Sequence, residues 1–400
     1  MKKKIIKIFL LLLLIIPFNI KADSFEIMSQ NVIMVNLNNN EIIYEKNKDD
    51  IIKVASMQKV MTTITAIENI EDLDSTVTIE EGMFSGLDRD LLTLGLYAGE
   101  QVTYRDLLYG TMLWSAADCA YALGVNVAGS EEQFVELMNK TAQKIGLNNS
   151  VFKNTTGLDA EGQYSTVYDI YVLFKYALNN KTFKEIISHE DYYTSDNQHH
   201  FEGPVYNAKN KFDMQYFLGG KTGFTEEAGL CLVSTASFNG IDYILVTAGA
   251  DYSYENQNYY DQKTIYDFYM ENYEFKDIIN KNDIVTTIKT QYDDSVDILA
   301  PRSVSLYINK SINVNDLDIE YIGEEILERG VKEGDKIGTY YIKYEDVVLY
   351  EEDLMSPITV KFKLKLVFKI IIGIVLFLFI LLMIVRQRNL RKRRRRRRRF

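Results

Sequence analysis

A serine and a lysine three residues apart are the first pair in the chain that could do chemistry. Ser56-Met57-Gln58-Lys59 opens a stretch whose apolar residues keep helical spacing to about Asn69, and residues three apart on a helix share a face. A serine hydroxyl becomes a good nucleophile only when a neighbouring base takes its proton, and a lysine whose pKa is lowered by burial can be that base. The pair therefore indicates acyl transfer through serine, although Ser-x-x-Lys alone also occurs by chance in helices.

Two further motifs follow along the chain. Ser115 stands in an apolar stretch directly after Trp114, where alone it would be uninformative. Lys221-Thr222-Gly223 is preceded by two glycines, and glycines at a strand edge let a substrate backbone approach closely. The lysine and threonine side chains offer charge and hydrogen bonds to a carboxylate. Each motif has a plain structural interpretation by itself, but chance explains poorly why all three occur in this order.

Histidine and cysteine are scarce, and this limits the possible chemistry. The three histidines, His189, His199 and His200, lie in one polar segment without a cysteine or carboxylate cluster at metal spacing. We therefore expect no metal and no cofactor, and we expect lysine rather than histidine to be the base. Cys119 and Cys231 are far apart and each lies in an apolar run, which predicts buried free thiols.

Charge is segregated along the 400 residues. The formal net charge is −11, but residues 1–22 hold 5 basic side chains, residues 361–400 hold 15, and neither stretch contains an acidic one. The remainder, residues 23–360, has a net charge of −31. A body this acidic repels polyanions, so nucleic-acid binding by it is not expected.

The two ends of the chain are typical of an exported membrane protein. Residues 1–22 combine lysines, an apolar run and a small residue at a cleavage point, which predicts a signal peptide, with an uncleaved anchor as the alternative. Residues 366–385 are apolar apart from Lys369 and Gly373, and are long enough to cross a bilayer core of about 30 Å. The polybasic tail, residues 386–400, predicts a cytoplasmic end and an extracellular body. A stop-transfer role for the tail is favoured over recruitment of anionic lipid or nucleic acid.

Elements that could position these motifs follow from the apolar patterns. Runs at 32–35 and 42–44 around three asparagines predict a hairpin, and further strands are expected at 230–237 and 243–248. Helices are expected at 56–69, as two segments within 103–125, and at 131–145, 169–178 and 262–273. This order favours an α/β (α+β) domain with an antiparallel sheet over residues 23–274. Short β-rich runs then predict a small all-β domain over residues 275–360.

Val54 to Thr62 resembles the nucleophile motif of the low-molecular-mass penicillin-binding proteins, the serine D-alanyl-D-alanine carboxypeptidases. The resemblance extends from about Ser24 to Met355. It implies a serine β-lactamase/transpeptidase-like fold for the first domain, followed by that family's C-terminal β domain. The other segments that carry it are 99–108, 154–159 with 164–169, 220–225 with 227–236, and 330–339.

The resemblance also implies a mechanism. Ser56 would attack the carbonyl of the penultimate D-alanine of a peptidoglycan stem peptide, and Lys59 would take the serine proton. Ser115, bridging Lys59 and Lys221, would relay a proton to the leaving amine. Water would then hydrolyse the acyl-enzyme, and β-lactam antibiotics would acylate the same serine as substrate mimics.

The resemblance also implies how the substrate binds, through the third motif of the family. Lys221 and Thr222 would hold the C-terminal carboxylate of the substrate. Gly223 and Phe224 complete this substrate-binding segment, and the backbone N–H groups of Ser56 and Phe224 would form the oxyanion hole.

Departures from the family pattern keep two other functions open. Ala117 stands where the family has an asparagine amide, and residues 238–262 contain no arginine or lysine for the substrate carboxylate. Val54 and Gln58 replace a proline and a threonine, which is expected to be tolerable. These changes leave open a weak or non-catalytic penicillin-binding scaffold. A β-lactamase is a further alternative, but no Glu-x-x-Leu-Asn segment for deacylation follows Ser115.

Overall fold

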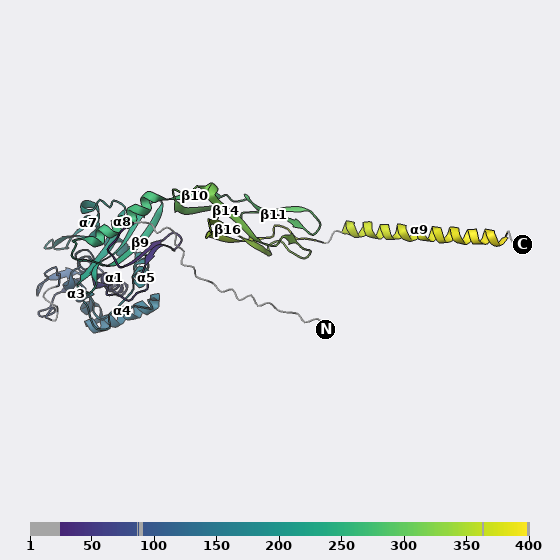
Figure 1. Ribbon diagram of the computed structural model, residues 1–400. Helices are drawn as coiled ribbons and strands as arrows, with labels where there is room; N and C mark the ends of the chain where they lie inside the picture. Colours follow the sequence, from purple (N-terminus) through teal and green to yellow (C-terminus); the bar gives the residue numbers. More distant parts are fainter. Residues whose placement is uncertain (1–24, 86, 88–90, 362–363, 398–400) are drawn as a thin grey trace. The chain divides into compact units, whose positions relative to one another are not determined.

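The computed structural model describes residues 25–85, 87, 91–361 and 364–397 (Figure 1). The expected signal peptide, residues 1–22, lies outside these residues, as does the last part of the polybasic tail, residues 398–400. The chain divides into two compact units between Glu271 and Asn272. The first unit is α+β and contains all of the candidate site residues, whereas the second unit carries the small β domain and one long helix.

A five-stranded antiparallel sheet organises the first unit, with strands in the order β2-β1-β9-β8-β7. The predicted N-terminal hairpin is β1–β2, and the two apolar runs near residues 230 and 245 are the neighbouring strands β8 and β9. The strand that carries the Lys-Thr-Gly motif, β7, is at the edge of the sheet, so one side of its backbone is free for other contacts. The bounds are Asn31–Asn36 (β1), Glu41–Lys46 (β2), Phe217–Thr225 (β7), Gly229–Phe238 (β8) and Ile241–Ala250 (β9).

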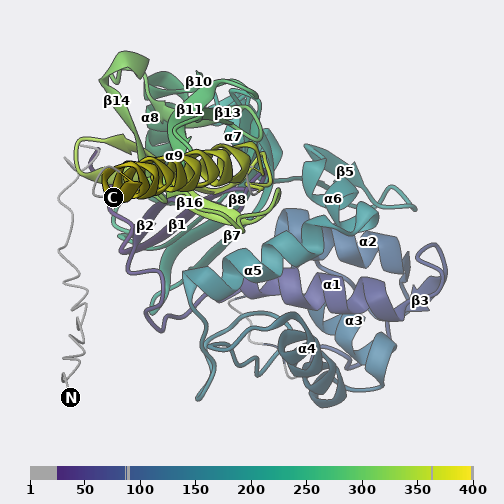
Figure 2. The same cartoon turned by 90° about the vertical axis from the view of Figure 1, so that its right-hand side faces the viewer.

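Helices cover both faces of this sheet. Figure 2 shows α1, α3, α4 and α5 on one side. On the other face, α8 is fixed by buried hydrogen bonds, because Gln262 Nε2 donates to the Leu232 carbonyl and Ser234 Oγ donates to Gln262 Oε1. The bounds are Ala55–Gln58 (η1), Lys59–Asn69 (α1), Tyr104–Tyr109 (α2), Gly110–Trp114 (η2), Ala117–Ala128 (α3), Glu131–Ile145 (α4), Val167–Leu178 (α5), Lys181–Ser188 (α6), Pro204–Lys211 (α7) and Gln257–Asn272 (α8).

The main core lies between the sheet and the helices α1, α3, α4 and α5. It contains fully buried side chains from β1 and β9, such as Ile33 and Val246, and from the helices, such as Ile64 and Phe174. Burial of one such side chain contributes about 1.5–3 kcal/mol to folding. Two small two-stranded sheets lie outside the central sheet, formed by Thr76–Thr78 (β3) with Gln101–Thr103 (β4) and by Asp191–Tyr193 (β5) with His200–Glu202 (β6).

Two helices differ in detail from the sequence prediction. The helix expected from Ser56 begins as the 3₁₀ turn η1 and becomes α-helical only at Lys59. The helix expected from Gln262 already begins at Gln257. Its first five residues include Asn258 and Asp261, which are buried and paired through hydrogen bonds, so an apolar pattern does not reveal this start.

The second unit is built from short strands around a small core, and its strand pairs are antiparallel except for the parallel pair of β11 and β15. Tyr340 and Ile342 of β16 are fully buried there, together with Leu327. The bounds are Tyr273–Ile279 (β10), Ile284–Thr290 (β11), Ser295–Leu299 (β12), Val304–Asn309 (β13), Val314–Asp316 (η3), Leu317–Gly323 (β14), Ile326–Leu327 (β15), Lys336–Tyr344 (β16) and Val347–Met355 (β17).

A single long helix, α9 (Leu364–Arg397), ends the described chain. Within it, Val367–Arg391 is long and apolar enough to cross a membrane, and it is the one helix of that kind in the described ranges. The predicted span of residues 366–385 falls almost entirely within this segment.

Candidate active site

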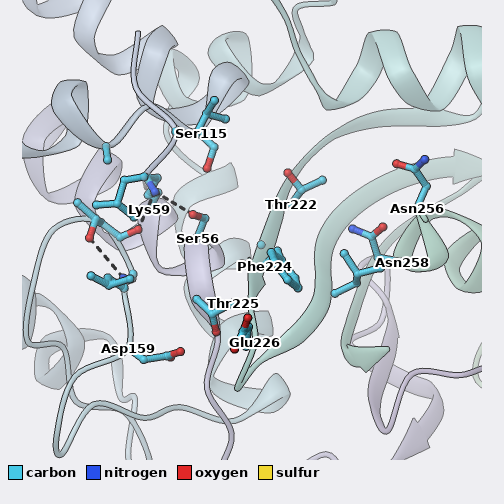
Figure 3. Close-up of a pocket in the computed structure, with 18 of the residues that line it drawn as sticks. Ser56, Lys59, Ser115, Asp159, Thr222, Phe224, Thr225, Glu226, Asn256 and Asn258 are labelled. Carbon is cyan, nitrogen blue, oxygen red and sulfur yellow. Dashed lines mark hydrogen bonds between the residues drawn. The ribbon is translucent and has the colours of Figure 1, made fainter. Parts of the chain in front are cut away.

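The predicted serines and Lys59 meet the edge strand β7 around a cleft of about 830 Å³ (Figure 3). Ser56 comes from η1, Lys59 from the start of α1, and Ser115 from the turn between η2 and α3. Thr222, Gly223 and Phe224 line the opposite wall. The remaining lining residues are Leu91, Leu92, Ala117, residues 156–159, Asn207, Thr225, Glu226, Leu230, Asn256, Asn258 and Tyr259.

Ser56 is held by an unusually close approach of three backbone segments. Ala55 has a φ of 45°, a left-handed conformation that non-glycine residues adopt rarely and that often marks functional sites. A Cβ atom at Gly157 would lie 2.2 Å from the Ala55 carbonyl oxygen, and one at Gly223 would lie 3.1 Å from the Ser56 nitrogen. These two glycines therefore let the 157 loop and β7 pack directly against the nucleophile turn.

The Lys59 amine lies in hydrogen-bond contact with the Ser56 hydroxyl, at an Nζ–Oγ distance of 2.8 Å. It also donates to the Thr156 carbonyl at 2.6 Å. Lys59 is 2% exposed, and the resulting desolvation lowers its pKa to about 7, against the smaller raising effects of Cys119 and Asp118. A substantial fraction of neutral amine is therefore present near neutral pH, as a general base requires.

The loop that supplies this carbonyl is fastened to the same helix at three successive residues. Gln58 Nε2 donates to the Asn154 carbonyl at 2.5 Å, Thr62 Oγ1 donates to the Thr155 carbonyl at 2.7 Å, and Lys59 donates to the next carbonyl. Gln58, which departs from the family pattern, therefore has a structural role. Because the three donors share one side of the helix start, the loop and the lysine are positioned together.

Ser115 is presented by a distorted helix end. The π-helical turn η2 widens the chain before it, and Ser115 itself adopts a left-handed φ of 64°. Asp118, three residues later, accepts hydrogen bonds from the backbone N–H groups of residues 94, 95, 96 and 119. Ala117 is 1% exposed, lines the cleft, and donates its backbone N–H to the Leu92 carbonyl at 2.8 Å. This network fixes the segment around residues 92–96 beside the cleft.

The expected bridge through Ser115 is not formed in this geometry. Its hydroxyl lines the cleft but makes no hydrogen bond to Lys59 or Lys221 in the part of the chain that the structure describes. Lys221 is fully buried, below the lining of the cleft, and its Nζ donates to the Thr222 carbonyl at 3.0 Å. Desolvation, followed by repulsion from Lys59, places the pKa of Lys221 well below its usual value.

Several lining groups have no counterpart in the predicted site. Asn207, Asn256 and Asn258 bring amide groups to the cleft, and Asp159 and Glu226 bring carboxylates. The sequence identifies segment 154–159 as a motif. It does not show that the Thr156 backbone carbonyl accepts a hydrogen bond from Lys59, because every residue has a carbonyl. Asn207 precedes Asn256 by 49 residues along the chain, so only the fold brings its amide to the same cleft as Asn256 and Asn258.

Among the described residues, no histidine or cysteine forms a hydrogen bond with Ser56, Lys59 or Lys221, although Cys119 is close enough to Lys59 to affect its pKa. His189 contacts Tyr109, and His199 Nε2 lies 2.8 Å from Glu100 Oε1. Cys119 and Cys231 are both buried free thiols, which confirms the sequence prediction. The described residues that line the cleft include no histidine and no cysteine.

The fold is the penicillin-binding/β-lactamase-like α+β fold. A solved structure of the D-alanyl-D-alanine carboxypeptidase DacD from Francisella tularensis aligns with a TM-score of 0.68 at 22% identity, covering 85% of this chain and 95% of that one. Penicillin-binding protein 5 from Haemophilus influenzae aligns with a TM-score of 0.62 at 23% identity, covering 85% and 99%. The predicted fold class, with its C-terminal β domain, is confirmed.

Family models identify the chain more narrowly. Residues 18–252 match the D-alanyl-D-alanine carboxypeptidase model, and residues 273–361 match the model of the penicillin-binding protein 5 C-terminal domain. The chain therefore belongs to the D-alanyl-D-alanine carboxypeptidase family. It is 28% identical over 345 residues to the carboxypeptidase DacF of Bacillus subtilis, which covers 84% of this chain and 86% of that relative. It is 30% identical over 227 residues to DacC of Escherichia coli, covering 54% and 56%.

Proposed function

We propose that the protein is a membrane-anchored serine carboxypeptidase that removes the terminal D-alanine from peptidoglycan stem peptides through a Ser56 acyl-enzyme. One observation carries the proposal: a buried lysine amine with a lowered pKa lies 2.8 Å from a serine hydroxyl in the cleft. Family membership supplies the substrate class.

In the proposed acylation step, Ser56 Oγ attacks the carbonyl carbon of the penultimate D-alanine while Lys59 Nζ accepts the hydroxyl proton. The backbone N–H groups of Ser56 and Phe224 would stabilise the developing oxyanion. The proton then passes to the amine of the leaving D-alanine, with Ser115 as the relay after rotation of its side chain. Attack of water on the ester, assisted by the same lysine, returns the free serine.

Binding of the substrate's C-terminal carboxylate is assigned to Thr222 and Lys221. Thr222 lines the cleft, whereas Lys221 acts through its charge from below the surface. A bound carboxylate would raise the pKa of Lys221, and the proton on Lys221 would in turn disfavour protonation of Lys59. The amides of Asn207 and Asn256 offer neutral donors at the same wall, in a chain whose residues 238–262 contain no arginine or lysine.

Labelled penicillin tests the acyl-enzyme and separates the alternatives. Slow release of the label together with D-alanine release from a diacyl-L-Lys-D-Ala-D-Ala peptide supports the carboxypeptidase. Rapid turnover of the antibiotic would instead indicate a β-lactamase, and absence of labelling would indicate a non-catalytic scaffold.

The topology follows from the charge pattern and from α9. We propose that α9 crosses the cell membrane once, with the acidic body outside and the polybasic tail in the cytoplasm. Protease added to intact wall-less cells should remove the body and leave the tail protected. Digestion of the tail from outside would overturn this topology.

A further inference from the structure

One end of the cleft is acidic. Asp159, from the loop that contacts Lys59, and Glu226, from the turn after β7, both line it. Figure 3 shows Asp159, Thr225 and Glu226 on the side of Ser56 away from Ser115. The mechanism proposed above uses neither carboxylate.

The Asp159 carboxylate lacks a partner of its own. Its Oδ1 atom is buried and accepts no hydrogen bond, and neither Asp159 nor Glu226 forms an ion pair within the described ranges of the chain. The neighbouring cation, Lys53, is engaged elsewhere, because its Nζ donates to the Ala160 carbonyl at 3.3 Å and lies 3.8 Å from Glu227. A buried carboxylate oxygen without a donor is costly, and in a substrate cleft it points to a donor carried by the ligand.

The direction of the substrate places a particular residue at this end. In the binding mode proposed above the substrate carboxylate lies at Thr222, and we take the peptide backbone to run beside β7 toward the end of that strand, where Glu226 follows. The four residue-to-residue steps from Thr222 to Glu226 span about 13 Å at roughly 3.3 Å per step. The residue that precedes D-Ala-D-Ala begins about 7 Å from the terminal residue, and a four-carbon side chain adds about 6 Å. An amine at the end of that side chain would therefore reach the two carboxylates.

We propose that Asp159 and Glu226 select substrates in which the residue before D-Ala-D-Ala carries a free side-chain amine. This inference rests on the proposed function. An ammonium group would donate to the orphaned Asp159 oxygen and reduce the net charge of the two carboxylates from −2 to −1. Acylation of that amine, as happens when a stem peptide becomes cross-linked through it, removes the charge and adds bulk at the same place. The enzyme would therefore act mainly on stem peptides that are not yet cross-linked at this position.

Three peptides of equal backbone length test the selection on the full-length protein. They are acetyl-L-Lys-D-Ala-D-Ala with a free side-chain amine, the same peptide with that amine acetylated, and acetyl-L-norleucyl-D-Ala-D-Ala, which has neither charge nor added bulk. We expect kcat/KM for D-alanine release to be about ten-fold higher or more for the free amine than for either neutral peptide. Norleucine distinguishes the effect of charge from that of size.

Matched variants test which side chains cause the preference for the free amine. Asp159→Asn and Glu226→Gln should each lower the ratio of kcat/KM for the lysine and norleucine peptides, with the larger decrease in Asp159→Asn. Glu227→Gln is the control. Glu227 follows Glu226 directly and carries the same charge, but it forms an ion pair with Lys53 and is not among the described residues that line the cleft. Its ratio should equal that of the wild type.

The outcomes separate this inference from the proposed function. Equal kcat/KM for the three peptides in the wild-type protein would overturn the inference, while D-alanine release would still support the carboxypeptidase. A wild-type preference that both Asp159→Asn and Glu226→Gln retain in full would overturn the assignment to these residues. No D-alanine release from any peptide and no penicillin labelling would overturn the proposed function, and the inference with it.

Discussion

The two compact units differ in the number of charged side chains that they bury. Among the described residues, seven charged side chains are buried, and all belong to the first unit. In the second unit, Thr290 and Ser356 are the buried residues classed as polar within the same ranges. Since burial of a charge is costly without compensation, the first unit has a feature that folding alone does not favour. The surroundings of these buried charges in the first unit therefore decide which of them fold the chain and which could serve a function.

Within the first unit, buried carboxylates and buried lysines have different surroundings. The five carboxylates accept several hydrogen bonds each. Asp118, for example, accepts four from backbone N–H groups, and Asp106 accepts from Tyr192 and Ser195. Lys59 and Lys221 have no carboxylate partner in the described part of the chain and donate to neutral oxygens. The carboxylates thus hold loops in place, whereas the lysines are left with lowered pKa values that suit proton transfer.

The largest effect on activity is expected when the nucleophile of the first unit is removed. We expect Ser56→Ala to abolish penicillin labelling and to lower D-alanine release by about three orders of magnitude or more, because the acyl-enzyme cannot form. Gel fluorescence with labelled penicillin and an assay of free D-alanine measure both. Ser234→Ala is a matched control, since this serine is buried in the same unit but bonds to Gln262 behind the sheet. Wild-type labelling in Ser56→Ala would rule out the assignment.

A core substitution in the second unit tests whether its role is separate from catalysis. Tyr340 is fully buried, and Tyr340→Ala should lower the free energy of unfolding of that unit by about 3–5 kcal/mol. Hydrogen exchange of β16 would report this loss. The sole tryptophan, Trp114, lies in the first unit, so its fluorescence reports unfolding there.

We expect neither Trp114 fluorescence nor the rate of acylation by penicillin to change in Tyr340→Ala. A matching loss in the acylation rate would show that the second unit supports the site, and the division of roles would fail.

The lowered pKa of Lys59 predicts a pH dependence of acylation. Below a pH of about 7 the amine becomes protonated, so the acylation rate should fall about tenfold per pH unit, and above that pH it should level off. Stopped-flow acylation by a chromogenic β-lactam between about pH 5.5 and 8.5 measures the profile. A rate independent of pH below 7 would contradict a lysine base.

The same shift affects stability. The unfolded chain binds more protons than the folded one between the folded pKa of about 7 and the ordinary lysine value of 10.5. The contribution of Lys59 to the free energy of unfolding therefore rises with pH across that window. Lys59→Met, which removes the titrating group, should lose this part of the pH dependence.

The sequence was sufficient for features that depend on local periodicity. It predicted the N-terminal hairpin, the helix that places Lys59 beside Ser56, and helix 131–145, because each depends on neighbours within a few residues. It could not predict that the Thr156 carbonyl contacts Lys59, since any residue supplies a carbonyl and the loop lies 97 residues away. It also missed the orphaned oxygen of Asp159, because a missing partner is a property of the folded surroundings.

The smallest expected effect concerns Ala117, where the family has an asparagine. Considered from the sequence alone, restoring the amide should raise acylation by about one to two orders of magnitude, since a hydrogen bond to a charged group contributes about 1.5–3 kcal/mol. In the structure, however, Lys59 already donates to Thr156 at 2.6 Å, so one role of the amide is filled by a backbone oxygen. Ala117 is also 1% exposed, and added atoms must displace neighbours such as the 92 segment.

We therefore expect Ala117→Asn to change the acylation rate by less than about tenfold, because the new amide would add only a hydrogen-bond donor to the substrate carbonyl. Ala117→Ser, which adds less volume and one donor, is the control for crowding. Acylation rates with penicillin and D-alanine release from the diacyl peptide measure the effect, and Trp114 fluorescence checks that the first unit is folded. A gain of about a hundredfold would show that the Thr156 carbonyl does not replace the amide and that this site lacks a catalytic group. A folded variant with a lower rate would show that the cleft is built around alanine.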